Sequence, residues 1–258
     1  MRFLVVKRRA VVLAVIAAVV LALAVTGVYY TGAAAIYSNV SPKKVPIYSV
    51  ETEQKAVALT FDAAWGADKT LGILETLEQK DACATFFLVS FWAEKYENEL
   101  KTLAASDRIE IGTHSATHPY MSKLTKSQME LELSTSKSLI ESISGRKVDL
   151  FRPPYGDYSD TVLNVAQAQG LYSIQWDVDS LDWKNLSKEQ ITSRVVGGAR
   201  NGSIILMHND GKHTLEALPS IIDGLRAKGF TFKTVGELIY KDNYTIDHTG
   251  RQIYNSGS

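Results

Sequence analysis

Two histidines separated by four positions, His114 and His118 in the stretch GTHSATHPY, are candidates for metal binding. On a helical turn this spacing puts both imidazoles on one side, where their nitrogen atoms can approach one zinc ion to about 2.0 to 2.1 Å. The alternative is a pair of polar loop histidines, because the spacing alone is weak evidence in a chain with five histidines. Their position directly after a predicted strand favours a metal site.

Asp62 and Arg152 each end another apolar, strand-like run, in LTFD and in DLFR. Two prolines follow Arg152 and stiffen the turn after it. A guanidinium fixed at such a place can hold a carboxylate in a bidentate pair and keep that carboxylate ionised. A purely structural ion pair is the alternative for Arg152.

The stretches WDVDSLDW and SIILMHND bring further acid–base groups to strand ends. A strand-end histidine such as His208 is often structural, but a nearby carboxylate would raise its pKa and suit it to general-acid catalysis near neutral pH. Trp183, directly after Asp182, suits the wall of a sugar-binding groove because aromatic faces pack on pyranose rings. The alternative for the three acids of WDVDSLDW is a set of solvated loop residues.

Seven short runs rich in β-branched or aromatic residues alternate with helical patterns. This repeated order predicts an α/β fold with a parallel sheet, because parallel neighbours need a crossover connection. Seven such units are enough to close, or nearly close, a deformed (β/α) barrel. Barrels of this kind carry their chemistry at the carboxyl ends of the strands. The expected strands lie near 57–62, 84–89, 108–113, 148–151, 172–178, 203–207 and 230–234.

Several helix ends can be predicted from their capping residues. Thr125 and Ser187 are each followed three positions later by glutamine, which is the spacing of a capping box at the start of a helix. Gly170 and Gly229 stand where the preceding helices should stop. These signals support helices between the predicted strands.

The first 36 residues differ in kind from the rest, because Lys7, Arg8 and Arg9 precede a long, almost uncharged stretch. This stretch can cross a hydrocarbon core of about 30 Å as a helix. It also exceeds the apolar core of about 7 to 15 residues in a signal peptide. We therefore expect a single-pass membrane anchor with its basic flank in the cytoplasm and the remainder outside. Cleavage near the small residues at 32–35, which would release a secreted form, is the alternative.

The remainder of the chain is expected to contain three parts. Residues 37–55 are polar with two prolines and are predicted to form a stalk that leads into the domain. The domain itself is expected over 56–240. The polar tail, 241–258, is predicted to be frayed.

Composition excludes several classes of function. Lys plus Arg and Asp plus Glu each number 28, so the formal net charge is zero and no basic field favours nucleic acid. Cys83 is the only cysteine, which excludes an intrachain disulfide and a cysteine-based zinc cluster. We expect it to be a buried, inert thiol. No GxSxG elbow, P-loop or GxGxxG motif follows a predicted strand, so serine-hydrolase chemistry and nucleotide binding are not expected.

In chain order, the stretches TFD, HSATH, RPPYG, DSLDW and LMH make the sequence resemble the polysaccharide deacetylase family. This family carries the NodB homology domain and is also called carbohydrate esterase family 4. The resemblance implies a deformed (β/α) barrel and metal-dependent removal of acetyl groups from N-acetylated sugars. It further implies a divalent metal cofactor, zinc in the first place with cobalt or manganese as alternatives, and a cell-wall glycan as the partner.

The resemblance assigns roles to nine residues of this chain. His114 and His118 match the metal-binding histidines, and Asp62 matches the general base, with Arg152 as its tether. Tyr155 matches the residue whose backbone N–H helps to stabilise the oxyanion. Asp182 matches the acid that orients the catalytic histidine, and His208 matches that histidine, the general acid. Trp183 and Leu206 match the walls of the acetyl pocket.

Position 63 departs from the family pattern. The family usually has a second aspartate there as a third metal ligand, whereas this chain has Ala63. Asp68 is the nearest spare carboxylate, but the dipole of the helix that follows explains an acid there without a metal.

The pattern FDxxWG is similar to the PdaB-like sporulation deacetylases, which implies peptidoglycan or spore cortex as the substrate. A catalytically silent homologue that binds glycan or a sporulation partner remains the alternative that Ala63 motivates.

Overall fold

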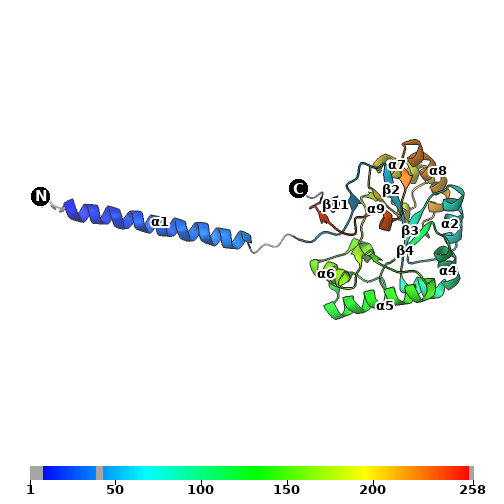
Figure 1. Cartoon of the computed structure of the whole chain (residues 1–258), viewed down its shortest axis with the longest axis horizontal. Coiled ribbons are helices and arrows are strands. Elements are labelled where there is room, and N and C mark those ends of the chain that lie inside the picture. The colour runs from blue at the N-terminus through cyan, green and yellow to red at the C-terminus, as the bar shows by residue number, and fades with distance from the viewer. Residues whose placement is uncertain (1–7, 39–42, 256–258) are drawn as a thin grey trace. The chain divides into compact units, whose positions relative to one another are not determined.

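The computed structural model describes residues 8–38 and 43–255 (Figure 1). Lys7 of the basic flank, residues 39–42 of the stalk and residues 256–258 of the tail lie outside the described residues. The chain divides into two compact units between Lys43 and Lys44. The second of these units contains the α/β domain.

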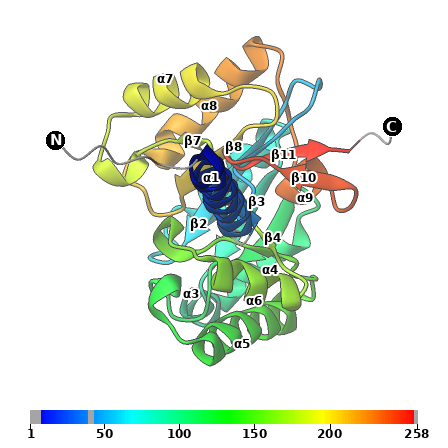
Figure 2. The same cartoon turned by 90° about the vertical axis from the view of Figure 1, so that its left-hand side faces the viewer.

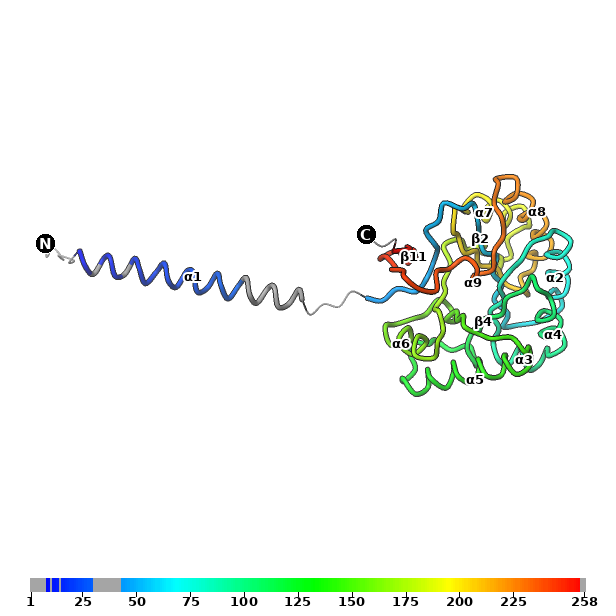
Figure 3. Tube along the Cα trace, in the orientation of Figure 1, coloured from blue at the N-terminus to red at the C-terminus, as the bar shows by residue number. Residues whose placement is uncertain are grey.

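The first unit contains the helix α1 (Arg8–Ser38), whose path can be followed in Figure 3. Its 19-residue stretch Val11–Tyr29 is long and apolar enough to cross a membrane. A signal sequence near the N-terminus has the same features. α1 is therefore one candidate for a membrane span or an export signal.

A curled half-barrel of seven parallel strands forms the centre of the second unit, in the order β6-β5-β4-β3-β2-β8-β7. This confirms the predicted α/β class and the parallel pairing. The short strand β9 (Thr231–Phe232) pairs with β2 outside that order. The strands of the half-barrel are β2 (Ala56–Ala63), β3 (Ala84–Leu88), β4 (Ile109–Thr113), β5 (Leu150–Phe151), β6 (Tyr172–Ser173), β7 (Val178–Asp179) and β8 (Ile204–His208).

Helices connect these strands; Figure 2 shows α7 and α8 together in one part of the domain and α5 and α6 in another. Thr125 and Ser187 form the expected capping boxes of α5 and α7. Gly170 and Gly229 have left-handed backbone just beyond α6 and α8, which ends both helices as predicted. The helices are α2 (Thr70–Gln79), α3 (Ser90–Lys95), α4 (Glu97–Ala105), α5 (Lys126–Ser144), α6 (Asp160–Ala168), α7 (Lys188–Gly198), α8 (Thr214–Ala227) and α9 (Val235–Leu238).

The prediction of one strand over 172–178 is wrong. β6 ends at Ser173 and β7 begins at Val178, and the two strands lie at opposite ends of the sheet order. Between them, Gln175 N–H donates to Ile47 O at 2.7 Å. The run of extended residues therefore crosses the open side of the half-barrel. An apolar pattern indicates extended backbone, but it does not say which strand that backbone pairs with.

The segment predicted as a stalk forms part of this domain from Lys44 onward. Ile47 pairs with Ile174 next to β6, and Val50 N–H donates to Gly202 O at 2.9 Å, next to the start of β8. Ile47 and Val50 are buried. This segment, which includes β1 (Ser49–Val50), therefore bridges the open side of the half-barrel.

The prediction that the tail is frayed is wrong for its described residues, which end at 255. β10 (Tyr244–Ile246) and β11 (Arg251–Tyr254) form an antiparallel pair, and β11 also pairs with β1 in parallel. Gln252, which is fully buried, exchanges hydrogen bonds with the backbone of Tyr240. A polar sequence thus forms a second, three-stranded sheet because its partner strand comes from the other end of the domain.

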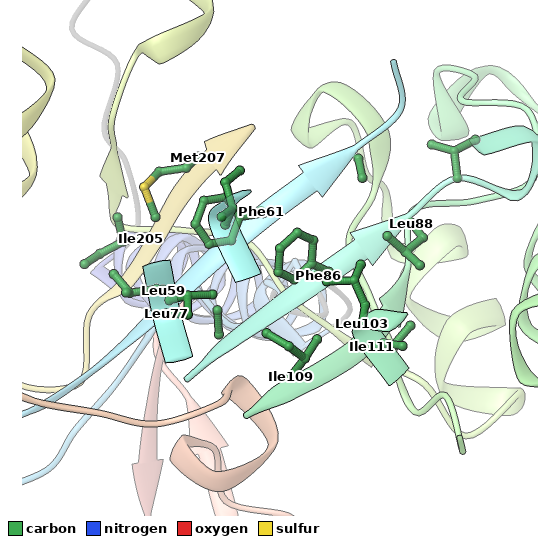
Figure 4. Close-up of a cluster of buried hydrophobic side chains, with 14 of the residues drawn as sticks. Leu59, Phe61, Leu77, Phe86, Leu88, Leu103, Ile109, Ile111, Ile205 and Met207 are labelled. Atoms are coloured by element: carbon green, nitrogen blue, oxygen red, sulfur yellow. The ribbon is translucent and has the colours of Figure 1, made fainter. Parts of the chain in front are cut away.

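Alternation along β2 explains why Asp62 faces the inside of the half-barrel. Leu59 and Phe61 belong to the large hydrophobic cluster between the sheet and the helices, which Figure 4 shows. Thr60 and Asp62, one position out of phase, point to the opposite side of the strand. Ala63 is fully buried and falls in the same cluster as Leu59 and Phe61.

Candidate functional site

A cavity of about 710 Å³ lies at the carboxyl ends of the strands. Eight of the nine residues assigned by resemblance line it, and the ninth, Arg152, is fully buried and bonded to one of them, Asp62. The lining residues predicted from the family pattern are Asp62, His114, His118, Tyr155, Asp182, Trp183, Leu206 and His208. The other charged and aromatic side chains of the wall are Trp65, Trp176, Asp179, Asp210 and Lys212.

Asp62 is held by a buried arginine. Arg152 Nη1 donates to Asp62 Oδ1 at 2.8 Å and to Thr60 Oγ1 at 2.8 Å, and the guanidinium lies 4.2 Å from the ring centroid of Phe87. Burial by itself would raise the pKa of the Asp62 carboxyl. The positive charge of Arg152, with contributions from His114 and His208, outweighs burial and holds this pKa below its ordinary value. Asp62 is therefore an ionised base at neutral pH.

The two histidines of GTHSATHPY lie together, but in a loop and not on the helical turn from which their spacing predicted it. Their ring centroids are 4.9 Å apart. His114 Nδ1 donates to Arg152 O at 2.7 Å, which leaves Nε2 as the free lone pair, 3.6 Å from Asp62 Oδ2. His118 adopts left-handed backbone with φ 59°, and its buried Nδ1 has no hydrogen-bond partner among the described residues.

This pair fits a divalent metal ion as two of its ligands. Burial, followed by the neighbouring His114, lowers the pKa of His118 to about 4, and burial also lowers the pKa of His114. Both rings are therefore neutral at pH 7, as metal ligands must be. The hydrogen bond from His114 to a backbone carbonyl is the usual orienting partner of a ligating histidine. Within the part of the chain that the structure describes, no cluster of three acidic, histidine or cysteine side chains could hold a metal.

Asp68 does not complete the ligand set. Its side chain is 74% exposed and pairs with Lys69 at 3.3 Å, and Asp68 does not line the cavity. Asp68 lies ahead of α2, whose N-cap is Lys69 and whose first turn contains no acidic residue, so the structure does not place it where the helix dipole was expected to explain it. Cys83 is only partly buried, and burial raises the pKa of its thiol to about 11, so its thiolate is scarce at neutral pH.

His208 has its own carboxylate partner. Asp182 in the short helix η3 (Asp182–Lys184) accepts from His208 Nδ1 at 2.7 Å, from His208 N–H at 2.8 Å and from Thr214 Oγ1 at 2.6 Å. Burial would lower the pKa of His208, but the bond and charge of Asp182 outweigh it and raise that pKa. A Cβ on Gly211 would lie 2.9 Å from Asp182 Oδ2, so only glycine leaves room for this arrangement.

Tyr155 occupies the short helix η2 (Pro154–Gly156) with left-handed backbone, φ 59°. No described residue accepts a hydrogen bond from its backbone N–H, although the N–H groups of Gly156 and Asp157 are both bonded to the preceding turn. The ring of Tyr155 lies 4.6 Å from that of His118. Trp183 and Leu206 line the same cavity, one exposed and one buried.

Sequence reasoning missed two hydroxyl groups, that of Thr60, which accepts from Arg152, and that of Thr214, which donates to Asp182. Thr60 lies two positions before Asp62 and faces the same side of β2, so strand alternation could have found it. Thr214 comes from the start of α8, and no local pattern connects it to Asp182. Tyr120, which stacks on Tyr155, is a third residue that the sequence does not single out.

Comparison with known proteins gives consistent matches. The family model described as polysaccharide deacetylase matches residues 49–174. A peptidoglycan-N-acetylglucosamine deacetylase of Bacillus cereus is 36% identical over 69% of this chain and 66% of its own length. A second Bacillus cereus protein with the same name is 32% identical over 78% of this chain and 96% of its own length. The chain thus spans slightly less than two thirds of the first of these relatives.

Solved structures add a different kind of relative. A protein of Bacillus anthracis described as a CE4 family pseudoenzyme superposes with a TM-score of 0.73 and 34% identity, over 78% of this chain and 70% of that one. A mutant of the same protein, described as having restored enzymatic activity, gives a TM-score of 0.73 and 35% identity, over 78% and 72% of the two chains. The fold is therefore similar to that of both active and inactive forms.

Proposed function

Because the chain belongs to the polysaccharide deacetylase family, we propose that it hydrolyses the N-acetyl groups of cell-wall polysaccharide in a metal-dependent reaction. One observation carries this proposal: a carboxylate and an imidazole face the same cavity, and each has a buried partner of opposite charge. Arg152 holds Asp62, and Asp182 holds His208. A protein that only binds glycan does not need an acid and a base that are both held in position.

The roles follow from the state of each group. His114 and His118 would hold a divalent ion, zinc in the first place, which when bound polarises the acetamide carbonyl and lowers the pKa of water. Asp62 accepts the proton of the attacking water. The free N–H of Tyr155 donates to the developing oxyanion, a contact of a type that contributes about 3 to 4 kcal/mol. His208 donates its proton to the leaving nitrogen, so that water and amide become acetate and a free amino sugar.

The substrate class and the location are inferred from the relatives and from α1. Relatives named as peptidoglycan deacetylases support peptidoglycan, or the related spore cortex, with either N-acetylglucosamine or N-acetylmuramic acid as the target sugar. An apolar N-terminal helix supports a single-pass anchor with the domain outside the cytoplasm. A role in sporulation remains a proposal based on FDxxWG.

A catalytically silent homologue is the second candidate, favoured by Ala63 and by likeness to a pseudoenzyme. The deciding experiment measures acetate released from peptidoglycan and from N-acetylated chitooligosaccharides by the full-length protein in detergent, with zinc, cobalt or manganese added. We expect release that depends on the metal and is abolished by a chelator. No release with any of the three metals would support the silent homologue instead.

Metal content tests the histidine pair. Replacement of His114 by alanine is expected to lower bound metal at least about tenfold, because one of two nitrogen ligands is lost. The matched control is His213→Ala, since His213 lies outside the cavity lining and pairs with Glu216 at 3.2 Å. Elemental analysis after dialysis checks both variants. Equal metal content in wild type and His114→Ala would show that the ion binds elsewhere.

The pH dependence of acetate release tests the general acid. His208 must be protonated to act, so activity is present below its raised pKa and is lost as pH rises through that pKa. Asp182→Asn removes the charge that raises this pKa. We expect the alkaline fall in rate to move to lower pH, with a rate at pH 7 reduced about 10²-fold or more. An unchanged alkaline limb in Asp182→Asn would exclude His208 as the group that titrates there.

A further inference from the structure

Four aromatic side chains that are more than half exposed gather at the cavity: Trp65, Tyr120, Tyr155 and Trp183. Three of them line it, whereas Tyr120 lies outside the lining and stacks on Tyr155, with ring centroids 4.3 Å apart and an interplanar angle of 18°. Exposed apolar side chains that cluster in this way mark binding surfaces in soluble domains. The catalytic roles proposed above leave Tyr120 unused.

Three of these rings, Trp65, Tyr155 and Tyr120, belong to a continuous band that also includes Phe91 and His118. From Phe91 to Trp65 the centroids are 5.3 Å apart, from Trp65 to His118 6.0 Å, and from His118 to Tyr155 4.6 Å. Tyr120 continues the band past the cavity. A ligand that follows the band therefore passes over the proposed metal ligand and on to a surface beyond it.

The stack of Tyr120 on Tyr155 is fixed in place by the surrounding chain. Two residues after Tyr120, Ser122 donates from its backbone N–H and its hydroxyl to the carboxylate of Asp157, at 2.7 and 2.8 Å. Asp157 itself lies two residues after Tyr155. Between Tyr120 and Ser122, Met121 is fully buried and anchors this loop in the core. Binding to a surface that is already ordered requires less loss of conformational entropy.

We infer that the Tyr120–Tyr155 stack is a subsite for the sugar ring next to the one that enters the cavity. The protein therefore binds an N-acetylated glycan over at least two consecutive sugars. A pyranose is apolar on its faces and polar at its rim, which suits an exposed, flat aromatic pair. The inference rests on the proposed function, because it assumes that the ring in the cavity is part of the same glycan.

The test compares the affinity for a tetrasaccharide with that for a monosaccharide. Tyr120→Ala is made in full-length protein that also carries Asp62→Asn, so that the ligand is not consumed. Calorimetric or NMR titration then uses N-acetylchitotetraose and N-acetylglucosamine. We expect about three- to tenfold weaker binding of the tetrasaccharide and unchanged binding of the monosaccharide, from the usual contribution of an aromatic contact.

Three further variants show whether a loss of tetrasaccharide binding comes from the loss of the Tyr120 ring. Tyr120→Phe keeps the ring and should bind like the parent. Tyr254→Ala removes another exposed tyrosine, whose ring lies 5.2 Å from that of Tyr240 and which is not part of the cavity lining, and should also bind like the parent. Ser122→Ala keeps both rings but loses one of the two bonds to Asp157, and should weaken tetrasaccharide binding by a smaller factor.

Either of two results would overturn the subsite: equal loss for both ligands in Tyr120→Ala, which would place its effect in the cavity, or no loss for either. Failure of the proposed function looks different. In that case the unmodified protein releases no acetate, whereas the difference between tetrasaccharide and monosaccharide binding remains measurable.

Discussion

Asp62→Asn is expected to reduce acetate release by about 10² to 10⁴-fold, the usual contribution of a positioned general base. The change keeps the size of the side chain and an oxygen that can accept from Arg152, but it removes the basic carboxylate. The pKa of Asp62 is held below its ordinary value, so the wild-type base is ionised across the neutral range and no protonation equilibrium hides the loss. Rates of acetate release with saturating metal measure the effect.

Asp68→Asn is the matched control for that variant. Asp68 lies in the loop after the strand that carries Asp62, but it is exposed and paired with Lys69, so its loss should leave the rate unchanged. A large drop in Asp68→Asn would instead revive it as a metal ligand. Activity in Asp62→Asn close to that of wild type would remove Asp62 from the mechanism.

Arg152→Met is expected to destabilise the domain by about 3 to 5 kcal/mol, the usual result of removing one partner from a buried ion pair. Arg152 is fully buried, and the carboxylate of Asp62 is 7% exposed, so Asp62 would be left charged with little access to water. Methionine retains most of the packing on Phe87. Denaturant unfolding followed by circular dichroism measures the free energy of unfolding.

The surface pair of Arg108 and Asp81 provides the comparison for Arg152→Met. Their atoms are 2.6 Å apart, but Asp81 is 80% exposed, so Arg108→Met should change stability by less than about 1 kcal/mol. Adding Asp62→Asn to Arg152→Met should cost less than the sum of the two single changes, because no unpaired charge then remains. Simple additivity would mean that the pair does not interact.

Most of the site could be predicted because it depends on strand order. His114, Arg152 and His208 each end or follow a strand, and parallel strands bring their carboxyl ends to one edge. The hydroxyl groups of Thr60 and Thr214 differ in whether the sequence could predict them. Thr60 shares a face with Asp62, whereas Thr214 reaches Asp182 only through the packing of α8. Local patterns predict side-chain direction along one element but not contacts between distant ones.

The errors in the fold prediction have a related cause. The predictions for 172–178 and for the polar tail rest on local composition, whereas both segments depend on the segment from Ile47 to Val50 for their pairing. The polar residues and prolines around that segment are typical of linkers and therefore predict a stalk. When two paired segments lie far apart in the chain, the residues of one segment do not indicate that it pairs with the other.

The parallel pairing of β1 with β11 constrains the order in which the domain can fold. Ser49 pairs with Arg251, and these residues lie near opposite ends of the domain sequence. Contacts between such distant residues form late, since they require most of the chain to be present. During synthesis, the half-barrel must wait for its last strands before its open side is secured. A ribosome that still holds the final residues therefore holds an unfinished domain.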